Sequence, residues 1–355
     1  MTFPIDEKIK TKAKRHIKCV IWDLDHTIWN GILMENSEVQ LHSHILDVII
    51  SLDKRGILQS IASRNEYDIA MEKLKELGIE EYFIYPQINW NNKSSSVQTI
   101  SNLININMDA IAFIDDQLFE REEVTFHHPQ VFCLDAVETV NLLKMSEFSP
   151  AFLTKDSINR RQMYLNDIVR KSAEDRFEGQ QDEFLYSLDM VLTLSFAEGD
   201  DLKRAEELTV RTNQLNATGY TFSYEEIEAL SHSPNHKLII CGLDDKFGTY
   251  GKVGLALLEC NNDCWTLKLL LVSCRVISRG IGAVMLNFIA KLANNAGKIL
   301  RGEFLPTGRN RMMLLTYKLS GFRELEEREG MLILEHEPSQ LQNVPEYITL
   351  FDYVS

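Results

Sequence analysis

The sequence predicts two domains, a parallel α/β sheet domain followed by an α+β domain. The chain has 355 residues, and an average domain has roughly 150. Short apolar runs alternate with helical patterns through the first part of the chain, whereas strand-like runs follow one another in the second part. We therefore expect a first domain over 1–150, including a short N-terminal extension, and a second over 151–355 that begins with connecting helices.

In the first domain, three buried strands each end at a polar residue. The apolar runs cover 19–22, 56–62 and 110–114, and helical patterns cover 43–54, 65–77 and 93–104. Strands that alternate with helices form a parallel sheet with right-handed crossovers. Side chains at the carboxyl ends of such strands share one crevice. Asp23, Ser63 and Asp115 are therefore expected to meet there.

The second domain is expected to contain consecutive strands and one long apolar helix. Its strand candidates are 237–243, 252–259 and 265–273, and the helix pattern covers 281–295. A polar, charge-rich helical stretch from about 144 to 183 is interpreted as the connection between the domains. This order of elements is typical of an α+β fold.

Composition and charge exclude several classes of protein. The chain carries a net charge of −15, which argues against binding to nucleic acid or to an anionic membrane surface. The polar N-terminus, the absence of a long apolar run and six scattered cysteines favour a cytoplasmic protein. One window is an exception, because 271–323 contains nine basic residues and one acidic residue. That window favours an anionic ligand or partner, and its few aromatic residues argue against nucleic acid.

The segment after the first strand has the residue types of a phosphoryl-transfer site. Asp23 and Asp25 lie two residues apart, so one carboxylate can attack phosphorus while the other serves as general acid and base. Lys93 and Ser63 supply a cation and a hydroxyl, and Asp115 adds a further carboxylate. Ligands that are all oxygen atoms suit Mg²⁺ better than Zn²⁺. The alternative is that these residues only cap strand ends and turns.

Four motifs in order resemble the haloacid dehalogenase (HAD) phosphotransferase superfamily. They are DLDHT, IASRN, NWNNKSSS and IDDQLFEREEV. The resemblance implies that Asp23 is the nucleophile and Asp25 the general acid and base, with Lys93 as a catalytic cation. It further implies phosphate or substrate binding by Thr27, Ser63, Arg64 and Asn65, and a Mg²⁺ site formed by Asp23, the Asp25 carbonyl, Asp115 and Asp116. Arg64 stands where many such proteins have lysine.

The spacing of these motifs leaves no room for a large cap domain. About 35 residues separate Thr27 from Ser63, and about 30 separate Ser63 from Lys93. An uncapped site does not exclude water by itself. We therefore expect the second domain or a protein partner to cover it.

A glycine-containing turn in the second domain resembles the core of the GNAT acetyltransferase fold. The stretch VSCRVISRGIGAVM reads as a strand, a turn and a helix start, whose N–H groups can bind a pyrophosphate. The resemblance implies that Gly280 and Gly282 receive a pantetheine pyrophosphate and that Asn310 and Tyr317 flank the pantetheine arm. Ile277 stands where that family usually has glutamine or arginine, which weighs against acetyl-CoA.

Cys274 is the candidate nucleophile of this turn. It lies at the end of the strand, where Arg275, Arg279 and the following helix start can lower the pKa of its thiol. The alternative is an inert, buried cysteine. Cys260 and Cys264 have no second ligand pair downstream, which argues against zinc.

Taken as a whole, the chain resembles the FkbH-like glyceryltransferases over about residues 17–325. The matching stretches include VIWDLDHTIWNGILMEN, FIDDQLFEREEV, EELTVRTNQLN, DDKFGTYGKVG and VSCRVISRG. The resemblance implies transfer of a glyceryl group from 1,3-bisphosphoglycerate, or a related phosphorylated three-carbon acid, through a cysteine thioester to an acyl carrier protein in polyketide or tetronate assembly. Arg275, Arg279, Gly280, Gly282, Asn310 and Tyr317 would form its carrier-protein and pantetheine surface.

Three other functions remain open at this point. One is a Mg²⁺-dependent HAD phosphatase of small molecules with a GNAT-like interaction domain. Another is a non-catalytic scaffold that recruits a carrier protein, and the third is a CoA-dependent N-acetyltransferase.

Overall fold

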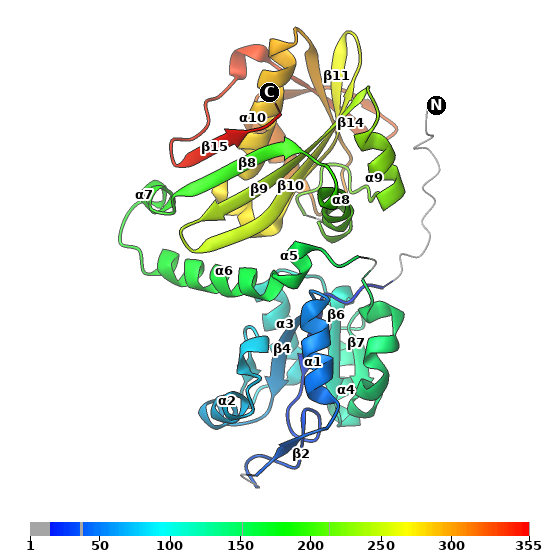
Figure 1. The fold of residues 1–355 in the computed structure, drawn as a ribbon, viewed down its shortest axis with the longest axis vertical. Helices are drawn as coiled ribbons and strands as arrows, with labels where there is room; N and C mark the ends of the chain where they lie inside the picture. The colour runs from blue at the N-terminus through cyan, green and yellow to red at the C-terminus, as the bar shows by residue number, and fades with distance from the viewer. Residues whose placement is uncertain (1–14, 36–37, 151, 213, 355) are drawn as a thin grey trace. The chain divides into compact units, whose positions relative to one another are not determined.

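The structure, a computed structural model, describes residues 15–35, 38–150, 152–212 and 214–354. The chain divides into two compact units, Met1–Tyr164 and Leu165–Ser355. The first unit contains a parallel sheet and the second a mixed sheet (Figure 1). The predicted fold class, a doubly wound parallel sheet followed by an α+β domain, is confirmed. Most of the predicted N-terminal extension, up to residue 14, lies outside the described residues.

The sheet of the first unit is parallel throughout and has the strand order β5-β4-β1-β6-β7. Every residue of β1, β4 and β6 is buried, as expected for a parallel sheet that helices cover on both faces. The strands are β1 (Cys19–Trp22), β4 (Leu58–Ser63), β5 (Gln87–Ile88), β6 (Ile111–Asp115) and β7 (Phe132–Asp135).

Helices connect these strands. The chain steps from β1 through β4 to β5, then returns to β6 and β7 on the other side of β1. Right-handed crossovers therefore place α1 and α2 on one face and α3 and α4 on the other. The helices are α1 (Ile45–Lys54), α2 (Tyr67–Glu76), α3 (Lys93–Ile104), α4 (Leu118–His127) and α5 (Lys155–Ile158). Among the residues described between β1 and α1, the strands form a small hairpin, β2 (Trp29–Asn30) and β3 (Gln40–Leu41).

The second unit is built on an eight-stranded sheet with the order β13-β14-β12-β11-β10-β9-β8-β15. Only the pairs β11–β12 and β8–β15 are parallel. The strands are β8 (Met190–Phe196), β9 (His236–Asp245), β10 (Gly248–Cys260), β11 (Cys264–Val272), β12 (Ile299–Phe304), β13 (Phe322–Arg328), β14 (Met331–His336) and β15 (Ile348–Asp352).

Two hydrophobic cores cover the two faces of this sheet. One packs α10 and α11 against alternating residues such as Ile239, Cys241 and Ala256. The other packs α8 and α9 against Leu238, Ile240 and their neighbours. The helices are α6 (Arg160–Asp175), which crosses the division between the units, α7 (Gln181–Tyr186), α8 (Asp200–Arg211), α9 (Tyr224–Ser231), α10 (Ile281–Asn295) and α11 (Arg311–Leu319). Among the described residues, none of the helices combines the length and apolar composition of a membrane crossing.

Candidate active site

The predicted crevice forms at the carboxyl edge of the parallel sheet. Asp23 directly follows β1, whereas Ser63 and Asp115 are the last residues of β4 and β6. Because β1 lies between β4 and β6 in the sheet, Asp23 has the other two residues on either side. Its backbone N–H donates to the carbonyl oxygen of Ile114 at 2.9 Å, which holds it in line with the neighbouring strand.

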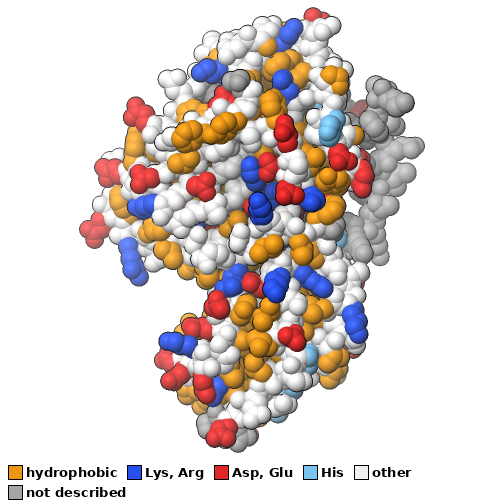
Figure 2. Space-filling view, viewed as in Figure 1, with side chains coloured by type: hydrophobic (Ala, Val, Ile, Leu, Met, Phe, Trp, Pro, Cys, Tyr) orange, Lys and Arg blue, Asp and Glu red, His pale blue; other side chains and the backbone are white. Residues whose placement is uncertain are grey.

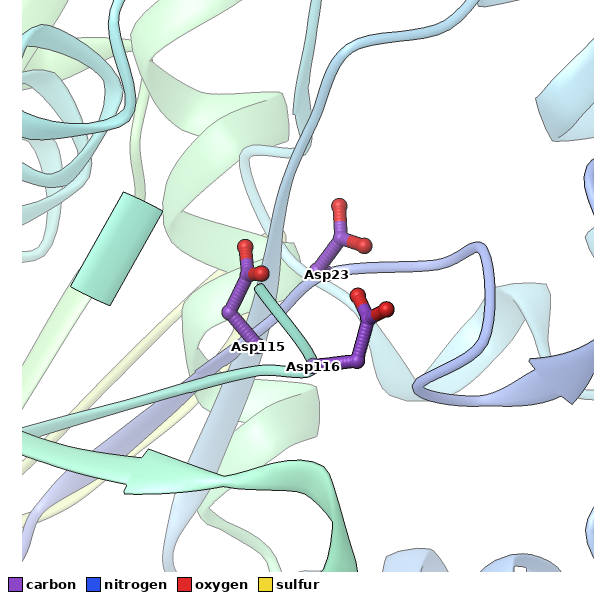
Figure 3. A group of neighbouring side chains, drawn as sticks. All are labelled: Asp23, Asp115 and Asp116. Atoms are coloured by element: carbon purple, nitrogen blue, oxygen red, sulfur yellow. The ribbon is translucent and has the colours of Figure 1, made fainter. Parts of the chain in front are cut away.

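Three carboxylates gather at this edge. Asp23, Asp115 and Asp116 each offer an oxygen, and these atoms all lie within 4.8 Å of one another (Figure 3). The ammonium group of Lys93, at the start of α3, contacts this cluster. Its Nζ donates to Asp23, to Asp115 at 2.9 Å and to the carbonyl oxygen of Ala62 at 2.8 Å. The sequence prediction named all four side chains, and the structure brings them together.

Burial and charge repulsion shift the pKa values of this cluster. Burial, with the nearby charge of Asp23, raises the pKa of Asp115 to about 6 although Lys93 opposes the shift. The same two causes raise the pKa of Asp116. Burial would lower the pKa of Lys93, but attraction to Asp23 and Asp115 raises it. The site therefore keeps a buried cation, and a divalent cation would relieve the repulsion among its carboxylates.

The residues of this cluster fit a hard divalent cation. All the donors are carboxylate oxygens, which Mg²⁺ prefers. One oxygen of Asp116, Oδ1, is buried and has no hydrogen-bond partner among the described residues. A buried carboxylate oxygen without a donor is costly, and a bound cation would satisfy this atom. Asp23, Asp115 and Asp116 could hold it together.

Asp25 is held by three neutral donors. Its Oδ1 accepts from the indole N–H of Trp29 at 2.8 Å and the backbone N–H of Leu33 at 3.0 Å, and its Oδ2 accepts from Asn65 at 3.1 Å. Burial nevertheless raises the pKa of Asp25, with a smaller contribution from Asp23. A positioned carboxyl group with a raised pKa is suited to donate a proton. Asn65, which the sequence assigned to substrate binding, orients this acid in the structure.

The remaining predicted residues of the first unit line the same edge. Ser63 and Thr27 are buried. The hydroxyl of Thr27 accepts from the backbone N–H of Asp116 at 3.1 Å, which ties the loop after β1 to the loop after β6. Arg64 follows Ser63 and forms an ion pair at 3.1 Å with Glu120.

Helix α4 contributes site residues that sequence reasoning missed. Glu120 pairs with Arg64. Arg121 donates to the carbonyl oxygen of Asp115 at 2.7 Å, and Glu123 accepts from the backbone N–H of Ser94, next to Lys93, at 2.9 Å. In the sequence these residues form a charge run, FEREEV, that resembles an ordinary solvated helix face. The burial of Glu120, which only the fold reveals, distinguishes them from such a face.

The second unit contains an apolar pocket of about 200 Å³ beside the glycine turn. Gly280 and Gly282 are among the residues that line it. Cys274 begins the 3₁₀ segment Cys274–Arg279, whose Val276 and Ile277 line the pocket. Cys274 is half-buried and is not itself among the lining residues. The other lining residues are Leu215, Val272, Ala283, Met312, Met313, Thr316 and Leu319.

Two arginines of this turn have partners inside the unit. Arg279 is buried, and its guanidinium donates to the carboxylate of Glu174 at 2.9 Å. Arg275 donates to the carbonyl oxygen of Tyr250 at 2.7 Å. The sequence placed both on a docking surface because it shows charge but not direction. In the structure they fasten the turn to α6 and to β10.

Asn310 secures a segment that lies between two diverging strands. Strands β11 and β12 pair only as far as Leu267 and Gly302. Beyond that point, residues 215–217 join them: the N–H of Ala217 donates to Leu270, and that of Leu305 donates to Ala217, both at 2.9 Å. The Asn310 amide donates to the carbonyl oxygens of Asn216 and Leu305, also at 2.9 Å. The structure thus places Asn310 against the chain itself and away from the pocket lining.

Tyr317 lies in the core of the second unit. Its side chain is fully buried, its ring packs edge-on against Phe322, and its hydroxyl has no hydrogen-bond partner within the described ranges. Burial raises the pKa of the hydroxyl. The structure does not bring Tyr317 to the lining of the apolar pocket.

We expect Tyr317→Phe to leave the second unit as stable as before, or more stable by up to about 1 kcal/mol. The change removes a buried hydroxyl that forms no hydrogen bond with the described residues and keeps the ring. Thermal unfolding of the two proteins checks this. A clear loss of stability would show that the hydroxyl has a stabilising partner.

Most charges of the basic window are paired. Arg301 pairs with Glu335 at 2.9 Å and Lys318 with Glu324 at 2.8 Å, and Arg323 pairs with Glu337. On the face that Figure 2 shows, acidic and basic side chains are interspersed. Two exposed arginines, Arg309 and Arg311, have no ion pair among the described residues and stand just before the pocket-lining part of α11.

Comparisons with solved structures find partial likenesses, each over about two fifths of this chain. The N-terminal part of a Bacteroides fragilis protein, described as containing a phosphatase domain complexed with Mg, is 27% identical, with 39% of this chain and 42% of that chain covered and a TM-score of 0.35. The ribosomal-protein-S18-alanine N-acetyltransferase of Escherichia coli is 17% identical, with 44% and 97% covered and a TM-score of 0.33. An N-acetyltransferase of Thermoplasma acidophilum in complex with coenzyme A is 15% identical, with 41% and 98% covered and a TM-score of 0.31.

The likeness to the Bacteroides protein therefore spans about two fifths of that chain. No protein-family model and no curated protein matches this sequence. Structures of a phosphatase domain and of GNAT-type acetyltransferases are thus what this chain is partly similar to.

Proposed function

We propose that the first unit is a Mg²⁺-dependent phosphoryl-transfer centre in which Asp23 is the nucleophile. The observation that carries this proposal is the contact of Lys93 with both Asp23 and Asp115 in one buried cluster. A third aspartate nearby, Asp25, has a raised pKa. Such a cluster has a nucleophile, a counter-charge for phosphate oxygens and an acid within one crevice. A bound Mg²⁺ would neutralise the charge that phosphate brings to these carboxylates.

Each side chain of the crevice has a separate role in the proposed reaction. A carboxylate oxygen of Asp23 attacks phosphorus and forms a phosphoaspartate, while Asp25 gives its proton to the departing oxygen. In the second half, Asp25 takes a proton from the water that attacks the phosphoaspartate, and phosphate leaves. Trp29, Leu33 and Asn65 keep the Asp25 carboxyl group fixed through both halves. Lys93 compensates negative charge on the phosphoryl group.

The full reaction that we propose is glyceryl transfer of the FkbH-like type. The thiolate of Cys274 attacks the carbonyl carbon of the acyl phosphate of 1,3-bisphosphoglycerate, and the C1 phosphate leaves as a 3-phosphoglyceryl thioester forms, which becomes a glyceryl thioester once water has hydrolysed the C3 phosphate ester. The pantetheine thiol of an acyl carrier protein then attacks this thioester and releases Cys274. The second phosphate is removed as inorganic phosphate by the Asp23 centre.

Three features of the second unit support this proposal. Sequence stretches that resemble the glyceryltransferases occur in both units, and one of them contains Cys274. An apolar pocket adjoins the Cys274–Arg279 segment and can take a narrow, uncharged arm. Arg309 and Arg311 offer positive charge near that pocket, which suits an acidic carrier protein.

The decisive test is loading of the enzyme from 1,3-bisphosphoglycerate. We expect intact-mass measurement to show an adduct of one glyceryl group on the wild-type protein, transferred to a carrier protein on its addition. Cys274→Ala should abolish the adduct and the loading of the carrier protein, because it removes the attacking sulfur. Phosphate release from 3-phosphoglycerate should persist in this variant, because the Asp23 centre is unchanged.

A matched control is Cys260→Ala, which removes another half-buried cysteine of the second unit. This variant should form the adduct like the wild type. Phosphate release without any adduct or carrier loading would contradict glyceryl transfer and leave a phosphatase. An adduct on Cys274→Ala would assign the thioester to another cysteine.

A further inference from the structure

A second cation lies at the mouth of the Asp23 crevice. Arg64 follows the last residue of β4, and its partner Glu120 stands in the first turn of the helix after β6. Since β1 separates these strands and neighbouring strands are about 4.8 Å apart, the pair bridges roughly 10 Å. The Arg64 side chain therefore extends past the carboxyl end of β1, where Asp23 lies.

The two cations of the site differ in depth. The side chain of Lys93 is 4% exposed, and its ammonium group is held by two carboxylates and a carbonyl oxygen. The side chain of Arg64 is 37% exposed. A phosphoryl group bound at Asp23 would therefore contact Lys93, whereas the part of the substrate nearer to solvent would contact Arg64.

Glu120 holds the guanidinium group of Arg64 in place but uses only part of its hydrogen-bonding capacity. Among the described residues, Arg64 forms one ion pair, between its Nη1 and Oε1 of Glu120 at 3.1 Å. Nε of Arg64 and Oε2 of Glu120 are buried and have no hydrogen-bond partner in the described part of the chain. Glu120 is itself buried, so it contacts Arg64 from the protein interior. Other N–H groups of the guanidinium fork stay available for a ligand. A planar fork of this kind binds carboxylate or phosphate oxygens in pairs.

We propose that Arg64, positioned by Glu120, binds a second anionic group of the substrate and makes the first unit selective for phosphate esters that carry one. This inference rests on the proposed phosphoryl-transfer function of Asp23. It adds the residues that recognise the second anionic group of such a substrate, a phosphorylated acid or a bisphosphate, namely Arg64 and its partner Glu120. Phosphate esters of neutral alcohols lack the group that Arg64 binds and are poorer substrates.

Two substrates with the same phosphate ester test the proposal. 3-Phosphoglycerate carries a carboxylate where glycerol 3-phosphate carries a hydroxymethyl group. Arg64→Met should lower kcat/KM for 3-phosphoglycerate by about 10- to 100-fold, mainly through KM, because a charge-assisted bond is lost. Its kcat/KM for glycerol 3-phosphate should stay within about twofold of the wild type. Arg64→Lys should fall in between, since lysine keeps the charge and loses the fork.

Glu120→Gln tests the positioning role, and Arg55→Met is the control. Glutamine keeps the shape but not the charge of Glu120, so the loss should again appear in KM for 3-phosphoglycerate only, by about 3- to 10-fold. Arg55 donates to the carbonyl oxygens of Leu143 and Phe148, away from the crevice. Its variant should change neither the ratio of the two substrates nor their KM values.

The possible failures are distinguishable. An equal loss on both substrates, or no loss on either, would overturn the role of Arg64 while the phosphatase stands. If the wild type hydrolyses neither substrate, the proposed phosphoryl-transfer function is wrong. Calorimetric binding of the same two molecules then tests the anion site of Arg64 separately. Weaker binding of 3-phosphoglycerate alone to Arg64→Met would support the anion site, and equal binding to both proteins would overturn it.

Discussion

Asp23→Asn is expected to lower phosphate release from 3-phosphoglycerate by at least about 10³-fold. The change keeps the size of the side chain and removes the oxygen nucleophile, and loss of a covalent nucleophile typically costs this much or more in kcat. The carboxamide of the variant can still contact Lys93, which also keeps its bond to Asp115 at 2.9 Å. The fold of the first unit is therefore retained, and the loss is chemical.

The measurement is steady-state phosphate release with matched thermal unfolding. Asp68→Asn, an exposed aspartate in the first turn of α2, is the control and should retain full activity. Activity of Asp23→Asn within about tenfold of the wild type would show that another residue or a water molecule attacks phosphorus. A large fall in unfolding temperature would instead show that the carboxylate is needed to neutralise Lys93.

Helix boundaries were the most predictable part of the fold, because local backbone features set them. The patterns over 93–104 and 281–295 coincide with α3 and α10. Asn105 ends α3 in the left-handed region at φ 57°, and Gly280 precedes α10 at φ 73°. Both residue types adopt that conformation more readily than others. The strand predicted over 56–62 begins later, at Leu58, because Gly56 forms a left-handed turn at φ 67°.

The crevice residues were predictable for a different reason. The carboxyl ends of neighbouring parallel strands lie at one edge of the sheet, and the order of strands and helices alone predicts this. Asp23, Ser63 and Asp115 could therefore be placed together without knowledge of any contact. Glu120 could not, since its importance lies in burial and in one contact with Arg64. The same holds for Asn310, whose partners Asn216 and Ala217 are more than 90 residues away. Side chains that act through long-range contacts carry no local signal.

The direction of charged side chains was the hardest feature to predict. The basic window was expected to face a partner, yet Arg275 and Arg279 point to acceptors within the unit. A sequence shows how many charged residues a segment contains but not where their side chains point. Whether a charge reaches the surface depends on the face of the sheet from which its side chain projects. The exposed Arg309 and Arg311 remain candidates for the role that the window suggested, and that role stays a prediction.

Arg170 is a buried cation that joins several parts of the second unit. Its side chain is 2% exposed. It donates to Asp245 at 2.6 and 2.9 Å, to Asp167 and to the carbonyl oxygen of Gly248 at 2.8 Å. Its guanidinium also stacks 3.7 Å from the ring centre of Tyr250. Burial raises the pKa of Asp167 although Arg275 and Arg170 oppose the shift, so the arginine compensates carboxylates that lie out of water.

Arg170→Met should therefore destabilise the second unit by about 3–5 kcal/mol, the usual effect of leaving buried charges without their partner. Arg161→Met on the same helix is the matched control. Arg161 pairs with Asp53 at 3.0 Å and Glu81 at 3.2 Å but is more exposed, so its loss should cost only about 1 kcal/mol. Hydrogen exchange of the β9 and β10 peptides measures the difference directly. Because β9 ends at Asp245, their protection should fall by at least about 100-fold in Arg170→Met. Unchanged protection would mean that the hydrophobic cores alone hold the two strands, and that the buried ion pairs serve to position the turn that carries Cys274.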